Sequence, residues 1–229
     1  WQHRSRQTYL KFCNYKHMNL RETFRYLGYH GQEPDEAAKN LAVICWKELE
    51  QAATPRSFYR EYPLEFTGDT GIVTPVFETQ SANLRKNLKD CEKLLVFAAT
   101  LGAGVDHLIQ RYTKIQMSKA VILQAAAAAM LEDYCDEVNE QIRRDYEIRG
   151  LYLRPRFSPG YGDFPLSCQP QLLGCLEAGK RIGITLTDSY LMAPSKSVTA
   201  VIGVSPVSRI CTVKGCEACG KTDCTYRRG

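Results

Sequence analysis

The feature that most constrains the fold is a long segment near the middle of the chain, residues 117–145, which reads MSKAVILQAAAAAMLEDYCDEVNEQIRRD. Alanine is the strongest helix former, and this segment carries five in a row. The segment therefore predicts the longest helix of the protein. Because alanine side chains are small, a neighbouring backbone or a ligand can come close to this helix, and we expect it to lie at the centre of the fold.

The segments before this helix alternate between helical and strand patterns. Residues 33–52 predict an amphipathic helix with Pro34 at an early helical position and acidic residues in the first turn. Residues 57–66 and 71–78 are rich in aromatic and β-branched side chains, which favours strands. Ser81 is then expected to cap a helix that runs to about Leu88.

Residues 93–112 predict a buried apolar run, a glycine-rich turn and a helix, which is the order in which a phosphate site can occur. The G-A-G turn lacks the third glycine of a dinucleotide fingerprint and the lysine of a P-loop. We therefore favour a tight strand-to-helix connection over a phosphate site.

Three elements are expected after the central helix. They are a short helix near residues 169–178 and two alternating runs, 184–194 and 196–204, predicted as strands paired around a turn at Pro194 to Lys196. With no repeat or low-complexity linker in evidence, the pattern predicts one α+β domain with a cysteine-bearing tail.

Composition narrows the class of protein. With 229 residues and 44% hydrophobic content, the chain can bury one sizeable core or two small ones. The formal charge of +5 comes partly from HRSR and YRRG at the two ends, so it argues little for a nucleic-acid partner. No apolar run approaches the roughly 20 residues of a membrane helix, and the first residues lack the apolar core of a signal peptide. We expect a cytoplasmic protein with neither a membrane nor a nucleic acid as partner.

The ten cysteines are unevenly distributed. Six are scattered, several of them in apolar helical patterns, which indicates a reducing compartment. The other four, Cys211, Cys216, Cys219 and Cys224, follow C-x4-C-x2-C-x4-C in the tail. The first three repeat a ferredoxin spacing, and the whole is as compact as a zinc knuckle, so the tail predicts an iron–sulfur cluster or a zinc ion. Reducible thiols on a flexible tail are the alternative.

The stretch 156–166, RFSPGYGDFPL, predicts a stiff loop. Prolines at 155, 159 and 165 prevent a helix, and the glycines permit positive φ and close approach of a ligand to the backbone. Composition alone favours an ordinary surface turn.

Two motifs carry a family resemblance. Arg156, Pro159, Gly160 and Tyr161 are followed by a T-x-S-x-x-M-x-P run, formed by Thr187, Ser189, Met192 and Pro194. Together they resemble the S-adenosylmethionine-binding activation domain of cobalamin-dependent methionine synthase. The resemblance covers residues 19–210 and is strongest over 156–204. It implies a curved antiparallel sheet flanked by helices, preceded by an N-terminal extension (1–18) and followed by the four-cysteine tail (211–229).

The resemblance also implies roles for individual residues. Arg156 is expected to bind the methionyl carboxylate, because its planar fork matches that group. Pro159 and Gly160 form the turn that lets the backbone reach the ligand, and Tyr161 stacks on the adenine or faces the sulfonium. Asp163 and Glu132 are candidates to offset the sulfonium charge. The implied chemistry is positioning, so no catalytic acid or base is expected.

The implied function is reductive remethylation of cob(II)alamin, which needs one electron and the methyl group of S-adenosylmethionine. The chain lacks a D-x-H-x-x-G stretch for a cobalt ligand, since Asp106 and His107 are adjacent. We therefore expect a free-standing component of a methionine synthase system that acts on a corrinoid held by that enzyme or another protein, with a separate electron donor.

A departure from the family pattern keeps alternatives open. Where the family supplies a further tyrosine near the ligand, this chain continues into the cysteine tail. An iron–sulfur electron-transfer protein that reduces a corrinoid partner without binding S-adenosylmethionine is therefore the alternative. A zinc-knuckle nucleic-acid binder is disfavoured, because aromatic residues are not interleaved with the tail's charges.

Overall fold

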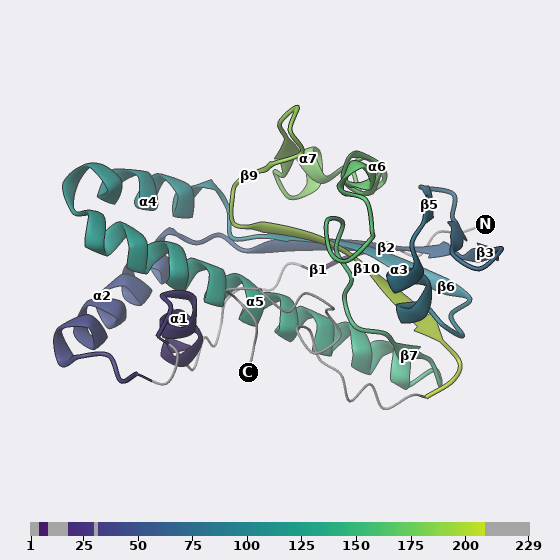
Figure 1. Ribbon diagram of the computed structural model, residues 1–229, viewed down its shortest axis with the longest axis horizontal. Helices are drawn as coiled ribbons and strands as arrows, with labels where there is room; N and C mark the ends of the chain where they lie inside the picture. The colour runs from purple at the N-terminus through teal and green to yellow at the C-terminus, as the bar shows by residue number, and fades with distance from the viewer. Residues whose placement is uncertain (1–4, 9–17, 30–31, 209–229) are drawn as a thin grey trace.

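The computed structural model describes residues 5–8, 18–29 and 32–208. Its centre is a five-stranded sheet in the order β1-β2-β6-β10-β7, in which every neighbouring pair is antiparallel. The strands are β1 (Ser5–Thr8), β2 (Arg56–Pro63), β6 (Lys93–Thr100), β7 (Tyr152–Leu153) and β10 (Ser197–Ser205). Helices cover the sheet (Figure 1). The predicted α+β class with an antiparallel sheet is confirmed, and β1 comes from the predicted N-terminal extension.

The central strands β6 and β10 are apolar because both of their faces are covered. Leu95, Phe97 and Ala99 of β6 contribute to one buried cluster, and the residues between them contribute to another. Alternate residues of a strand point to opposite faces, so this short run separates two cores. A strand buried on both faces reads as continuous hydrophobicity rather than alternation.

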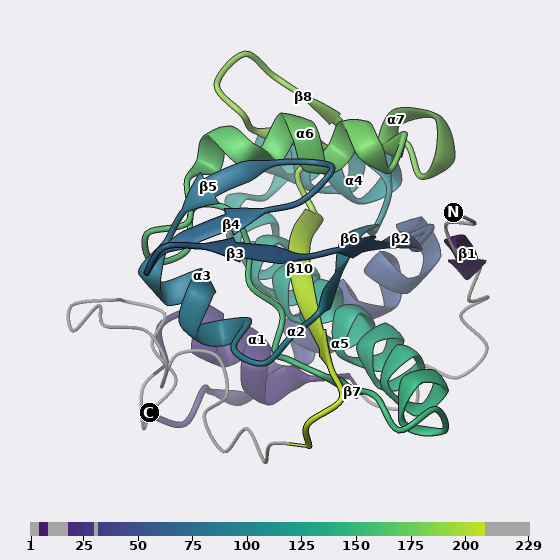
Figure 2. The same cartoon turned by 90° about the vertical axis from the view of Figure 1, so that its right-hand side faces the viewer.

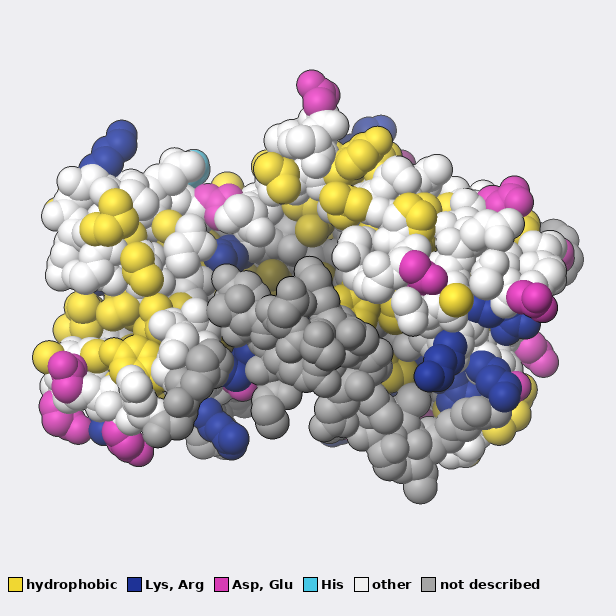
Figure 3. Space-filling view, viewed as in Figure 1, with side chains coloured by type: hydrophobic (Ala, Val, Ile, Leu, Met, Phe, Trp, Pro, Cys, Tyr) yellow, Lys and Arg dark blue, Asp and Glu magenta, His cyan; other side chains and the backbone are white. Residues whose placement is uncertain are grey.

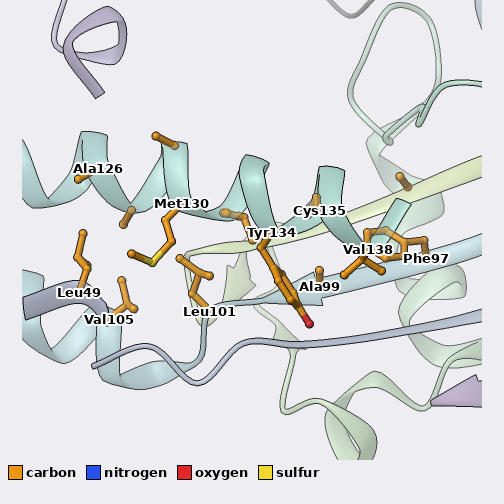
Figure 4. Close-up of a cluster of buried hydrophobic side chains, with 14 of the residues drawn as sticks. Leu49, Phe97, Ala99, Leu101, Val105, Ala126, Met130, Tyr134, Cys135 and Val138 are labelled. Carbon is orange, nitrogen blue, oxygen red and sulfur yellow. The ribbon is translucent and has the colours of Figure 1, made fainter. Parts of the chain in front are cut away.

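Four helices build the core on one face of the sheet: α1 (Leu20–Tyr26), α2 (Glu36–Ala52), α4 (Ala103–Ile115) and α5 (Met117–Glu147). α5 is the predicted long central helix, with 31 residues. Four of its five consecutive alanines are buried, and Met130, Tyr134 and Val138 pack toward the strands (Figure 4). Tyr134 reaches through this core to donate a hydrogen bond to Ser57 Oγ at 3.1 Å.

Smaller elements cover the other face (Figure 2). A three-stranded antiparallel sheet in the order β3-β4-β5 packs there with short helices. These elements are β3 (Glu65–Thr67), β4 (Gly71–Val73), β5 (Glu78–Gln80), α3 (Ala82–Asn87), the 3₁₀ helix η1 (Leu166–Cys168), α6 (Gln169–Cys175) and α7 (Ala178–Arg181). Their buried residues, with Phe58 and Val96 of the central sheet, form the second core.

Helix starts follow the predicted capping chemistry with one correction. Ser81 Oγ accepts a hydrogen bond from Leu84 N at 3.0 Å and caps α3, as predicted. Pro34, predicted inside the first turn of α2, lies before the cap. Asp35 accepts a hydrogen bond from Ala38 N at 2.7 Å and fixes Glu36 as the first helical residue.

Three predicted elements are divided in the structure. Residues 57–66 split at the buried Leu64 into β2 and β3, which belong to different sheets. Residues 71–78 are interrupted by a turn in which Thr74 Oγ1 bonds the backbone of Phe77, giving β4 and β5. The helix near 169–178 ends at Cys175, and α7 follows Glu177, which has φ +50°.

The predicted pairing of 184–194 with 196–204 is wrong. The first run folds on itself, so that β8 (Thr185–Leu186) pairs with β9 (Met192–Ala193). The second run is β10, which pairs with β6 along its length and with β7 at its end. The polar residues between 187 and 190 favour a turn, whereas the apolar β10 belongs inside the central sheet.

The G-A-G turn between β6 and α4 is a tight connection. Gly102 has φ +85°, and a side chain at Gly102 or Gly104 would collide with Thr54 or with the carbonyl oxygen of Ala52. Close packing against the end of α2 thus explains both glycines without a ligand.

A membrane-spanning helix must be both long and apolar. α5 is long enough to cross a bilayer but too polar to do so, and no other helix within the described ranges has both the length and the apolar character.

Candidate functional site

The stretch 156–166 begins as a continuation of the sheet edge. Arg154 N donates to Gly203 O at 2.8 Å, and Phe157 and Val201 exchange two backbone hydrogen bonds of 2.9 Å beside β10. Consecutive residues of such an extended segment point to opposite faces. Phe157 accordingly enters the core under α3 and α6, while Arg156 turns toward α5. The sheet edge thus places the arginine.

Beyond Phe157 the chain folds into a compact turn. Gly160 N donates to Phe164 O at 2.8 Å, and Phe164 N donates to Tyr161 O at 3.1 Å. Gly160 and Gly162 have φ of +85° and +57°, which side chains disfavour, so the predicted positive φ is confirmed at both glycines. We call residues 157–164 the glycine loop.

Aromatic packing supports the glycine loop from below. The rings of Phe157 and Tyr161 meet edge to face with centroids 5.3 Å apart, and the buried Phe164 packs on Phe77 at 5.7 Å. Tyr161 is half-buried, so one part of its ring joins the core and the other remains accessible. Aromatic side chains therefore support the inner side of the loop, and its outer side is accessible to a ligand.

Arg156 is a largely buried cation with two acidic partners on α5. Its Nη2 lies 3.0 Å from Glu132 Oε2 and 2.7 Å from Asp136 Oδ1. The arginine side chain is 16% exposed, compared with 39% for Glu132 and 67% for Asp136. Burial acts to lower the pKa of Arg156, but the neighbouring Cys135, Glu132 and Asp136 outweigh it and the pKa is raised. Burial also raises the pKa of the Cys135 thiol to about 12, so it is neutral at physiological pH.

The two acidic partners of Arg156 share one nitrogen of its fork. A guanidinium grips a carboxylate with two bonds along either edge that includes Nη2. Among the described residues, both carboxylates bonded to Arg156 use Nη2. An incoming carboxylate that takes a two-bond grip must therefore displace one of them from Nη2.

Asp163 faces the N-terminus of α3. Its carboxylate accepts hydrogen bonds from Ser81 Oγ, from Ala82 N at 2.7 Å and from Asn83 N at 3.2 Å. Burial alone would raise the pKa of Asp163, but these hydrogen bonds lower it, so the carboxylate is ionised. The hydrogen bonds of this predicted site residue therefore go to the start of α3.

The T-x-S-x-x-M-x-P run forms the turn and the second strand of the β8–β9 hairpin. Thr187 Oγ1 lies 3.0 Å from Ser189 Oγ and accepts a hydrogen bond from Leu191 N at 3.1 Å, which closes the turn. Met192 packs against the second core, and Pro194 O accepts a hydrogen bond from Ser197 Oγ at 2.7 Å. Gln169 of α6 donates to Tyr190 O at 3.3 Å and connects the hairpin to the segment that follows the glycine loop.

The molecular surface is hollowed between α4 and the α6–α7 region, above the central sheet (Figure 3). Hydrophobic side chains are visible inside this hollow. The hairpin lies at its upper edge, as comparison with Figure 1 shows.

The structure brings Glu132 to Arg156, which directly precedes the glycine loop, and adds Asp136 as a second acidic partner. A spacing of four residues on a helix places Asp136 on the same face as Glu132, which was the available signal. Ser81 and Asn83 were also missed, because no local pattern links them to a loop about 80 residues away. The four tail cysteines lie outside the described residues. Within those residues, no group of three or more His, Cys, Asp or Glu side chains is arranged to hold a metal ion.

The fold and the site define an α+β protein that presents a rigid glycine–aromatic loop beside a buried, acid-paired arginine. The family model described as "Vitamin B12 dependent methionine synthase, activation domain" matches residues 85–229, more than half of the chain. The chain belongs to this family.

A solved structure supports the same fold. The crystal structure described as the MetH reactivation domain bound to AdoHcy matches with a TM-score of 0.60 and 18% identity. The match covers 91% of this chain and 80% of that one. At this identity the match demonstrates a shared architecture.

Proposed function

We propose that this chain binds S-adenosylmethionine at the glycine loop and Arg156, and supports reductive remethylation of cob(II)alamin on a cobalamin-dependent methionine synthase or related corrinoid methyltransferase. The observation that carries the proposal is the largely buried guanidinium next to a turn with two positive-φ glycines. Family membership supports it, and the solved relative is described as bound to AdoHcy, the demethylated product of this cofactor.

The residues present fit the amino-acid part of such a ligand. Arg156 offers its fork to the carboxylate, while Glu132 offers oxygens to the ammonium group. Asp136 is the more exposed acid and is the one we expect the ligand carboxylate to displace from Nη2. Glu132 then stays with Arg156 and accepts from the ligand ammonium.

The glycine loop fits the remainder of the ligand. The exposed Gly160, which follows the buried Pro159, presents backbone groups without a Cβ, and Tyr161 offers a ring held by Phe157. An aromatic face attracts both adenine and a sulfonium cation. When bound, S-adenosylmethionine supplies the methyl group that, together with one electron, converts cob(II)alamin to methylcobalamin and leaves S-adenosylhomocysteine. The chain's contribution is to orient the methyl group toward the partner's corrinoid.

The boundaries 1–18, 19–210 and 211–229 are part of the proposal. We propose that Cys211, Cys216, Cys219 and Cys224 bind an iron–sulfur cluster or a zinc ion, on the strength of their spacing. A second candidate function, electron transfer to a corrinoid without S-adenosylmethionine binding, is favoured by the same four thiols. A cluster would connect the site to its electron donor, whereas zinc would only stabilise the tail.

Calorimetric titration of the anaerobically purified chain with S-adenosylmethionine tests the proposal, with the visible spectrum and metal content of the same sample recorded. Saturable binding that is lost in Arg156→Ala and kept in Cys219→Ser supports it. No binding, together with a brown absorbance that bleaches on reduction, supports the electron carrier instead. Loss of binding only in Cys219→Ser would place the site in the tail.

A further inference from the structure

The glycine loop is joined to a part of the molecule that contributes nothing to the proposed ligand contacts. Asp163, inside the loop, accepts hydrogen bonds from Ser81 Oγ and from the backbone amides of Ala82 and Asn83. These donors open α3, at the end of the β3-β4-β5 sheet. The loop therefore depends on a helix that precedes it by about 80 residues.

A second contact joins the same two segments. A Cβ placed on Gly162 would lie 2.9 Å from Asn83 Nδ2 and 3.3 Å from Asn83 Cβ. Gly162 also has φ +57°, which a larger residue disfavours. Glycine at this position therefore suits a close approach of the loop to α3, where the neighbouring Asp163 accepts both amides.

The same segments also meet through their apolar side chains. Phe77, just before β5, packs on Phe164, and Phe164 packs on Phe157 with centroids 6.3 Å apart. Phe157 in turn contacts Tyr161. A row of rings therefore leads from the β3-β4-β5 sheet to the tyrosine of the proposed site, parallel to the polar connection through Asp163.

We infer that Asp163 is a positioning residue, which holds the glycine loop in its ligand-binding shape by anchoring it to the start of α3. The inference rests on the proposed function and refines it, since Asp163 acts through the loop and not on the sulfonium. A site that is correctly shaped only part of the time binds more weakly in proportion to that fraction. Loosening the anchor therefore lowers the apparent affinity without removing any ligand contact.

Asp163→Asn tests the inference, because it removes the charge and keeps the shape. Hydrogen bonds to a charged group are worth more than neutral ones, so affinity for S-adenosylhomocysteine should fall about tenfold. Amides of residues 157–164 should exchange hydrogen faster by mass spectrometry, while those of α5 and β10 keep their rates. Asp69→Asn is the matched control: Asp69 is exposed in the turn between β3 and β4, and the same charge change there should alter neither property.

Gly162→Ala provides an independent route to the same result, because it pushes the loop away from Asn83 and leaves the carboxylate intact. Its affinity loss and that of Asp163→Asn should not add in the double variant, since both release one contact.

Unchanged affinity in Asp163→Asn, with tight binding by the unsubstituted chain, would overturn the inference alone. A loss of affinity with unchanged loop exchange would overturn it too, because it would mean that Asp163 contacts the ligand directly. Absence of saturable binding by the unsubstituted chain would refute the proposed function, and the inference with it.

Discussion

Two largely buried cations, Lys119 on α5 and Arg156 beside it, differ in what surrounds them. Lys119, near the start of the helix, donates to Glu48 of α2 and to Tyr112 of α4, and its ammonium sits 4.1 Å from the centre of the Tyr112 ring. Arg156 approaches the same helix further along, from the sheet edge, and meets Glu132 and Asp136. Both cations are paired with carboxylates, yet only one lies beside a glycine loop.

Exposure separates the two sites. The side chain of Lys119 is 8% exposed and that of its partner Glu48 is 29% exposed, whereas Asp136 beside Arg156 is 67% exposed. Lys119 donates to groups on two other helices and closes a junction of three helices. Arg156 uses one nitrogen, Nη2, for both acids among the described residues. A paired buried cation is therefore structural where its partners enclose it, and is suited to binding where they can be displaced.

The largest expected effect breaks the Lys119 junction. Glu48→Gln leaves a buried ammonium without its counter-charge and should lower the free energy of unfolding by about 2–3 kcal/mol, less than for a fully buried pair because Glu48 is partly exposed. Urea denaturation measures this. Glu50→Gln, an exposed position on the same helix, is the control and should have little effect. Affinity for S-adenosylhomocysteine should be unchanged in both variants.

Arg156→Ala should have the opposite effects, a large loss of ligand affinity and a small change in stability. Loss of a two-bond, charge-assisted contact should weaken S-adenosylhomocysteine binding by about 100-fold, with a change in unfolding free energy of about 1 kcal/mol or less. Arg156→Lys keeps the charge without the planar fork and should recover only part of the affinity. Equal binding by Arg156→Ala and the unsubstituted chain would show that the arginine is structural, like Lys119.

Raising the pH should weaken the stabilising effect of Lys119 and leave that of Arg156 unchanged. Burial alone would lower the pKa of Lys119, but hydrogen bonds with Glu48 and Tyr112 raise it above the ordinary 10.5. A raised lysine pKa stabilises the fold fully below the unfolded value, and this stabilisation disappears as pH rises through the folded value. The stability difference between the unsubstituted chain and Lys119→Met should therefore narrow by about 1 kcal/mol between pH 8 and pH 11.5.

The Arg156 pairs provide the contrast in the same experiment. The pKa of Arg156 is raised, so the guanidinium keeps its charge over this range. The stability difference between the unsubstituted chain and Arg156→Ala should stay constant. If both differences narrowed together, a general alkaline loosening would be responsible.

The smallest expected effect concerns Asp136, the acid that the ligand is proposed to displace from Nη2. Asp136→Asn removes the more exposed competitor for Nη2, so affinity for S-adenosylhomocysteine should rise about two- to threefold, as expected for a weak exposed pair. Glu132→Gln should lower it, because Glu132 is the acid proposed to hold the ligand ammonium. The same sign for both variants would contradict these separate roles.

Local patterns predicted the parts of this molecule that depend on local physics. The helix through the five alanines, the Ser81 cap and the positive φ of Gly160 and Gly162 each follow from the residues themselves. The strand pairing of β10 could not be predicted in this way. Pairing depends on which strands are neighbours in the folded sheet, and the sequence of an apolar strand does not identify its partner.

The candidate site shows the same division. Arg156 and the glycine loop were recognisable as a motif, and Glu132 was close enough on α5 to be proposed. The anchoring contacts of Asp163 were not predicted, because the amides that engage it belong to a helix 80 residues earlier. Backbone donors have no sequence signature, so only the three-dimensional arrangement reveals them.

The most direct test of the central claim compares two ligands on two proteins. 5′-Methylthioadenosine contains the adenosine and sulfur of S-adenosylhomocysteine but lacks the amino-acid carboxylate and ammonium. If Arg156 holds that carboxylate, Arg156→Ala should lose affinity for S-adenosylhomocysteine by about 100-fold and bind 5′-methylthioadenosine as the unsubstituted chain does. Equal losses for both ligands would show that Arg156 shapes the pocket without gripping the carboxylate, and would contradict the account.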